Sequence, residues 1–232
     1  MKTSNKFLLS LTFLILLTLI GNALVLKQEY NKLDLNDPFF GYQKESLSSF
    51  SGIDLNGTLV GNLKIIPGDS FNIYYGKGYK DRVNWHIAGD TLKMDFVDEW
   101  RHSRSQPSPD DFFDWRSRIF IVTPSLKFLN SRDIVSQLEN FELKNLTIAI
   151  NGKGSGILLR DNAIDRLNLT SHDSSVSLIS QSNKVETALI DMTSNSKLTL
   201  ELTQIDSLKI KYDSTTVLSM PGVLLKRLNP YP

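Results

Sequence analysis

The pattern of hydrophobic and polar residues divides the chain into an apolar start and a long remainder of short alternating runs. Residues 7–26 read FLLSLTFLILLTLIGNALVL, without a charge. From Phe50 onward, apolar and polar residues alternate in runs such as SGIDLNGTLVG and RVNWHIAGDTLKMDF, which are separated by glycine, asparagine, aspartate and serine. Alternation with a period of two is typical of half-buried strands. The pattern therefore predicts one N-terminal helix followed by an all-β domain, in which only residues 132–141 also suit a helical turn.

The C-terminal half of the chain repeats itself. Units begin at Leu143, Ile164, Val185 and Ile205, at spacings of 21, 21 and 20 residues, and each holds two short runs with a polar turn between them. A fixed period of this size predicts stacked coils, whose backbone groups pair between coils while alternate side chains form one apolar core. We therefore expect a single-stranded right-handed parallel β-helix over residues 50–232. An antiparallel sandwich or barrel is the alternative.

The composition excludes several ways of stabilising the fold and several kinds of functional site. The chain has 232 residues and no cysteine, which excludes disulfides, thiolate metal sites and cysteine nucleophiles. Recurrent buried aliphatic side chains, each contributing about 1.5–3 kcal/mol, are expected to hold the coils together instead. The chain carries 26 Lys+Arg and 25 Asp+Glu, so it has no broad basic field and nucleic acid is not an expected partner.

The apolar start predicts a membrane segment. A helix of 20 residues spans about 30 Å, enough to cross the hydrocarbon core of a bilayer. Lys2 and Lys6 precede it, which favours a cytoplasmic N-terminus and an extracytoplasmic remainder. A signal peptide cleaved after Ala23 and a buried core helix are the alternatives. We expect residues 1–26 to be a membrane anchor or signal segment and residues 27–49 a juxtamembrane linker.

One long loop carries most of the candidate binding chemistry. Residues 98–117 read DEWRHSRSQPSPDDFFDWRS and lie between two predicted strands. Aromatic faces beside carboxylates and guanidinium groups can hold a sugar or a peptide, and long loops in compact domains are often functional. The candidate binding residues are Trp100, Arg101, His102, Asp111, Phe113 and Trp115. The alternative is an aromatic lid packed over the domain, with its charges in solvent.

The sequence predicts no catalytic residue, metal or cofactor. Its three histidines, His86, His102 and His172, lack the spacing of a metal site. The stretch GKGSG lacks the glycine spacing and the following Lys-Ser or Lys-Thr of a phosphate-binding loop. Asp165, Asp191 and Asp206 occupy loosely equivalent places in the repeat and suit a solvated rim better than a catalytic column.

Three stretches give the chain a family resemblance. The stretches SFSGIDLNGTLVG, GDTLKM and NLTIAINGKGSGILL resemble the auto-transporter adhesin head GIN domain family, and the resemblance runs from about Phe50 to Met220. The resemblance implies a β-helical domain of bacterial cell-envelope proteins, without established catalytic residues. Gly154, Ser155 and Gly156 match the glycine-serine-glycine turn of that family. Later turns carry DSS, SNS and DST instead, and residues 98–117 resemble an insertion.

These observations lead to one expected function and its alternatives. We expect a membrane-tethered module in the periplasm or on the extracytoplasmic side of a bacterial cell envelope, with an adhesin-like or scaffold role and no catalysis. A carbohydrate-binding or carbohydrate-active domain that uses residues 98–117 is the alternative. The expected partners are the membrane and an envelope protein or glycan, and self-assembly through exposed coil ends is a further possibility.

Overall fold

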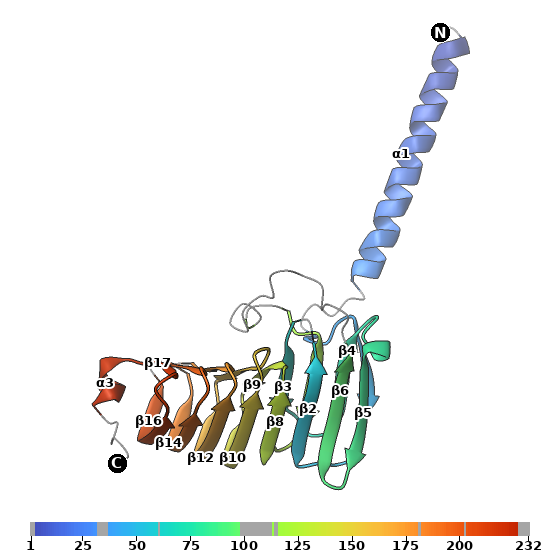
Figure 1. Ribbon diagram of the computed structural model, residues 1–232. Helices are drawn as coiled ribbons and strands as arrows, with labels where there is room; N and C mark the ends of the chain where they lie inside the picture. Colours follow the sequence, from blue (N-terminus) through green and yellow to red (C-terminus); the bar gives the residue numbers. More distant parts are fainter. Residues whose placement is uncertain are drawn as a thin grey trace. The chain divides into compact units, whose positions relative to one another are not determined.

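The computed structural model describes residues 3–31, 37–59, 61–97, 113, 116–180, 182–201 and 203–226 (Figure 1). These fall into two compact units, residues 1–41 and residues 42–232. We describe each unit by itself.

The first unit contains one long apolar helix, α1 (Thr3–Tyr30). It is long and apolar enough to cross a membrane, with a mean hydropathy of 2.3 over its most apolar window. The hydroxyls of Thr12 and Thr18 donate to the carbonyls of Leu8 and Leu14, at 2.9 and 3.1 Å, so these polar groups are satisfied within the helix. None of its side chains is buried within this unit. The predicted N-terminal helix is thus confirmed.

The second unit consists of two β-sheets (Figure 1). The eight-stranded sheet has the order β16 (Gln204–Tyr212), β14 (Lys184–Met192), β12 (Ala163–His172), β10 (Glu142–Asn151), β8 (Phe128–Arg132), β2 (Gly52–Thr58), β6 (Thr91–Val97) and β5 (Val83–Ala88). The nine-stranded sheet has the order β1 (Tyr42–Ser46), β4 (Asn72–Gly76), β7 (Ile119–Thr123), β3 (Leu63–Pro67), β9 (Val135–Glu139), β11 (Gly156–Arg160), β13 (Val176–Ile179), β15 (Lys197–Leu200) and β17 (Val217–Ser219). Two short helices complete it, η1 (Lys80–Arg82) and α3 (Gly222–Leu225).

The sequence repeat sets the register of the parallel strands. From β8 to β17 the chain alternates between the two sheets, so each repeat gives one strand to each. The first residues of the repeats are direct partners, Leu143 with Ile164, Ile164 with Val185 and Val185 with Ile205. The predicted alignment of the repeats is therefore confirmed.

The expected single-stranded right-handed parallel β-helix is wrong. Both sheets are mixed, because β1 pairs antiparallel with β4, β4 with β7, and β5 with β6. The difference arises before residue 140, where the sequence has no fixed period. There, Gly89, with a positive φ of 63°, allows a short turn that returns β6 antiparallel to β5. The domain is thus mostly β, as expected, but it is built from two mixed sheets.

The main core lies between the two sheets and includes inward residues of both. Leu146, Leu167, Ala188 and Leu208 are direct partners along the eight-stranded sheet, and none is more than 4% exposed. From the nine-stranded sheet, Leu159 and Leu198 are fully buried in the same core. At the C-terminal end, Leu224 of α3 is also part of it.

Buried asparagines complete the hydrogen bonding at one corner between the sheets. The Asn162 amide donates to the Leu138 carbonyl at 2.9 Å, and the Asn183 amide donates to the Leu159 carbonyl at 2.7 Å. The two side chains also meet, since Asn162 Nδ2 donates to Asn183 Oδ1 at 2.9 Å. Buried turn carbonyls need such partners, because water cannot reach them.

Substitution of one inward leucine tests the confirmed register. We expect Leu167→Ala to lower the free energy of unfolding by about 2–5 kcal/mol, because it leaves a cavity at a fully buried position. Leu189→Ala is the matched control, since Leu189 lies on the neighbouring strand β14 and is 39% exposed; its cost should stay within about 1 kcal/mol. Urea denaturation measures both, and equal losses would contradict the assignment of inner and outer faces.

A half-buried aspartate stabilises the last turns of the repeat. The Asp213 carboxylate accepts hydrogen bonds from the Ser194 backbone N–H at 2.8 Å and from the Thr215 backbone N–H at 2.9 Å. The Ser194 N–H first, and then the Thr215 hydroxyl, hold the pKa of Asp213 well below its usual 3.8. The charged carboxylate is therefore the form that the fold favours.

This depressed pKa gives a pH-dependent contribution to stability with a defined sign. Because the pKa is lower in the folded chain than in the unfolded chain, the contribution is complete above about pH 4 and is lost as the pH falls below that value. We expect Asp213→Asn to lower the melting temperature at pH 7 and to have progressively less effect from pH 4 to pH 2. Thermal melts of both proteins test this, and a difference that does not shrink at low pH would contradict it.

Candidate functional site

A polar groove lies on the outer face of the eight-stranded sheet. It has a volume of about 580 Å³ and is open to solvent along the sheet. Six strands contribute to it, namely β2, β5, β6, β8, β10 and β12. Its outward-facing side chains are Asp54, Asn56, His86, Lys93, Asp95, Asn130, Arg132, Ala149, Asn151 and His172.

Strand alternation explains why these side chains face solvent. On β2, Ile53 and Leu55 are buried in the core, which turns Asp54 and Asn56 to the outer face. On β6, Leu92 and Met94 are buried in the same way and turn Lys93 and Asp95 outward. The polar residues of the groove are therefore placed by the apolar residues between them.

The register arranges the groove residues in two rows across the strands. One row runs Lys93, Asp54, Asn130, Ala149 and Thr170, each the direct partner of the next. The second row runs Asp95, Asn56, Arg132, Asn151 and His172, again as direct partners. Since neighbouring strands lie about 4.8 Å apart, each row presents polar side chains at that spacing. Ala149 of β10 interrupts the first row with a small side chain.

Few of these polar groups are used inside the protein. Asn56 Nδ2 donates to Asp95 Oδ1 at 3.1 Å, and His172 Nδ1 contacts the Thr193 hydroxyl. Within the described residues, no ion pair joins Lys93 or Arg132 to a carboxylate. The groove therefore offers two cations, two carboxylates and several amides to a ligand.

An aromatic ring lies beside the rows. Phe128 precedes Asn130 by one outward position on β8, and it is half-buried. Its ring covers Gly52 on β2, where an added Cβ atom would lie only 1.9 Å from Phe128 Cζ. Glycine is therefore required at position 52 to let the ring lie against the sheet, next to the side chain of Asp54.

The described residues do not form a metal site, because no three histidine, aspartate or glutamate side chains among them are grouped closely enough to hold an ion. The groove instead suits a ligand that forms several hydrogen bonds and ionic contacts with an open surface.

Most of the binding residues predicted from the sequence cannot be placed. Trp100, Arg101, His102, Asp111 and Trp115 lie outside the described residues. Phe113 is described, and it lies against the outer face of the nine-stranded sheet, away from the groove on the eight-stranded sheet.

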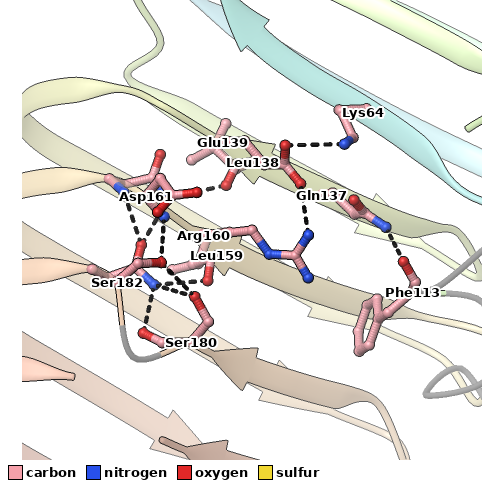
Figure 2. A network of polar contacts seen from close by, with 12 residues as sticks. Lys64, Phe113, Gln137, Leu138, Glu139, Leu159, Arg160, Asp161, Ser180 and Ser182 are labelled. Carbon is pink, nitrogen blue, oxygen red and sulfur yellow. Dashed lines mark hydrogen bonds and ion pairs between the residues drawn. The ribbon is translucent and has the colours of Figure 1, made fainter. Parts of the chain in front are cut away.

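Phe113 makes both apolar contacts and a hydrogen bond with the outer face of the nine-stranded sheet around β9. It packs with Val135, Leu158 and Val176 in a small cluster separate from the main core, and only 7% of its surface is exposed. Its carbonyl accepts a hydrogen bond of 2.6 Å from Gln137 Nε2 (Figure 2). All five residues of β9 are buried, although alternate ones point away from the core.

An ionic network adjoins this surface on the same face of the sheet. Glu139 of β9 lies between Lys64 of β3, at 3.0 Å, and Arg160 of β11, at 3.6 Å (Figure 2). Because Glu139 is only 8% exposed, its charge needs these two partners. The outer face of the nine-stranded sheet near β9 is thus occupied by the protein's own side chains.

Sequence reasoning missed the groove. Its residues span positions 54 to 172, and they meet only because β2, β6, β8 and β10 are neighbours in the sheet. The available signal was local: the pairs Asp54 and Asn56, Lys93 and Asp95, and Asn130 and Arg132 each alternate with apolar or small residues. Nothing in these pairs indicates which strands lie side by side.

Comparison with known proteins gives similar structures at low sequence identity. A structure described as a "putative adhesin" from Bacteroides fragilis is 14% identical, with a TM-score of 0.44, over 77% of this chain and 92% of that one. One described as a "putative adhesin" from Parabacteroides merdae is 12% identical, with a TM-score of 0.36, over 78% and 91% of the two chains. A "putative lipid binding protein" from Parabacteroides distasonis is 12% identical, with a TM-score of 0.34, over 77% and 93%.

No family model and no curated protein matches the chain. The resemblance to the head GIN domain family rests on the sequence motifs alone. We therefore base the functional proposal on the groove.

Proposed function

We propose that the protein is a membrane-tethered, non-catalytic binding module whose groove on the eight-stranded sheet binds a glycan. The observation that carries the proposal is the pair of cross-strand polar rows, whose side chains face solvent and are largely unpaired within the described part of the chain. The role is adhesin-like, in that an anchored domain presents a binding face to a ligand outside the membrane.

The chemistry of the groove supports a glycan as the ligand. Hydroxyl groups both donate and accept hydrogen bonds, and the rows offer donors in Lys93 and Arg132, acceptors in Asp54 and both in Asn130. The Phe128 ring beside them offers an apolar surface for the carbon face of a sugar ring. An open groove also accepts a chain that continues beyond the contacted units, which an enclosed pocket would not.

The helix α1 supports the tether. It is exposed along its whole length and it is long enough to span a bilayer. With Lys2 and Lys6 before it, we propose that the N-terminus lies in the cytoplasm and that the two sheets lie on the extracytoplasmic side of a bacterial cell envelope.

The carbohydrate-binding role that the sequence suggests for residues 98–117 stays a prediction. Five of its six candidate residues lie outside the described residues, and Phe113 contributes a backbone carbonyl and a buried ring to an internal contact.

Alkaline carbonate extraction of membranes from cells that make the full chain tests the tether. We expect the protein to stay in the membrane pellet, and its mass to include residues 1–26. Replacement of Leu16 by lysine should weaken insertion, because a charge at the centre of a spanning helix costs about 2.5–3.5 kcal/mol. Release of the unmodified protein by carbonate, or a mature chain that begins at Leu24, would contradict the anchor.

Filling the groove tests the binding face. We expect the full chain in detergent to bind a subset of an immobilised glycan array, and Ala149→Trp to reduce that binding about tenfold or more by filling the part of the groove that lies over β10. Asn145→Trp is the matched control, because Asn145 is exposed on the same strand but does not line the groove. Both variants should keep the wild-type melting temperature. Equal binding by the two variants would contradict the assignment of the groove.

A further inference from the structure

We propose that the outer face of the nine-stranded sheet at its β1 edge is a membrane-contact surface that recognises anionic lipid headgroups. The proposal rests on the tether proposed above, because it assigns a second, reversible contact to a domain that is already held at a bilayer. It concerns a different sheet from the glycan groove.

Aromatic side chains form the base of this surface. The rings of Tyr42 on β1 and Phe120 on β7 pack edge to face, with centroids 5.1 Å apart. Tyr74 on β4 is the direct partner of Lys44 on one side and of Phe120 on the other, so these residues share the outer face of the sheet. The Tyr42 hydroxyl donates to the Ser117 carbonyl at 2.5 Å and fixes the chain that enters β7.

Cations lie over these rings. Lys44 Nζ is 5.8 Å from the Tyr74 ring centroid, and the Arg116 guanidinium is 5.5 Å from that of Tyr42. Next to them, the ring of Tyr79 has Arg82 and Arg118 near it, each at 5.7 Å. All four of these cationic side chains are exposed. We refer to Lys44, Arg82, Arg116 and Arg118, with Tyr42 and Tyr79, as the basic aromatic patch.

The local charge differs strongly from that of the whole chain. The chain carries a formal net charge of only +1, whereas four cations lie near the rings of Tyr42, Tyr74 and Tyr79. The nearest carboxylate on β1, that of Glu45, belongs to the other face, where it accepts a hydrogen bond from the buried Tyr75 hydroxyl at 3.4 Å. Tyrosine and arginine are the residue types that suit a headgroup layer, because their apolar parts and polar ends meet both environments.

Chain connectivity restricts how far the patch lies from the helix end. Tyr42 follows Tyr30, the last residue of α1, by 12 positions. Even a fully extended chain of that length reaches only roughly 40 Å. A tether this short gives the patch a high effective concentration at the bilayer surface, so weak attraction to anionic lipids is sufficient for contact.

A quenching experiment on the full chain tests the proposal. The chain has no cysteine, so single cysteines can be labelled with a fluorophore without competition. Ser46→Cys places the label on β1 beside the patch, and Ser219→Cys places it on β17, at the opposite edge of the same sheet; both serines are exposed. The labelled chains are reconstituted in lipid nanodiscs that carry a headgroup-attached nitroxide quencher.

We expect quenching at position 46 to exceed quenching at position 219 by about threefold in discs rich in phosphatidylglycerol. The excess should disappear in phosphatidylcholine discs and at about 0.5 M salt, where charges on the surface are screened within a few ångströms. It should also fall when Lys44, Arg82, Arg116 and Arg118 are replaced by glutamine. If that variant does not fold, Lys44→Gln alone, with the salt series, supplies the same comparison.

The result distinguishes this proposal from the tether. Equal quenching at the two positions, or quenching independent of lipid charge, would overturn the membrane contact even if carbonate extraction shows that the helix is embedded. Protection of position 46 that grows with protein concentration in phosphatidylcholine discs would overturn it too, and would assign the patch to a second copy of the chain. Carbonate release of the chain would instead remove the tether.

Discussion

The structure depends on the in-register stacking of parallel strands, which fixes the face of every side chain. A strand alternates its side chains between two faces, so a slip of one residue would expose the core and bury the polar face. Leu146, Leu167, Ala188 and Leu208 show the inner side of this constraint, because they are direct partners and are all buried. The polar rows of the groove show the effect of the same constraint on the outer face of the eight-stranded sheet. The same register that closes the core therefore aligns Asp54 with Asn130, and Asn56 with Arg132, across the sheet.

Stacking also requires hydrogen-bond partners for the backbone polar groups that become buried at the turns. Asn162 and Asn183 each donate to a carbonyl of an adjacent repeat, those of Leu138 and Leu159, at this corner. The Leu159 carbonyl also accepts from the Ser180 backbone N–H at 3.0 Å. One repeat further along the chain, Thr203 takes the equivalent position, and its hydroxyl lies 3.1 Å from the Ile179 carbonyl and 2.7 Å from the Ser180 carbonyl. A polar side chain thus occupies this corner in the repeats that begin at Ile164, Val185 and Ile205, whereas Phe141 takes the equivalent position before Leu143. Each of these hydrogen bonds stabilises the stack by about 1 kcal/mol.

The sequence predicted those parts of the fold that local spacing controls. Repeats of 21, 21 and 20 residues were enough to align β10, β12, β14 and β16, because residues one repeat apart in the sequence are direct partners on neighbouring strands. The antiparallel pairs were missed because they depend on contacts that no period records, such as β1 with β4, where Tyr42 meets Gly76. The groove was missed for the same reason, since β2 lies between β6 and β8 in the sheet but not in the chain.

The outer faces of the two sheets differ, and the difference follows from what covers each of them. Around β9, the outer face of the nine-stranded sheet is buried by Phe113 and by the ion pairs of Glu139, so its side chains are committed to internal contacts. The outer face of the eight-stranded sheet keeps Lys93, Asn130 and Arg132 exposed. Exposed charges on a β-sheet contribute little to stability and are readily replaced. The rigid core fixes the backbone positions of these side chains in register, so ligand binding has to order their rotamers but not the strands that carry them.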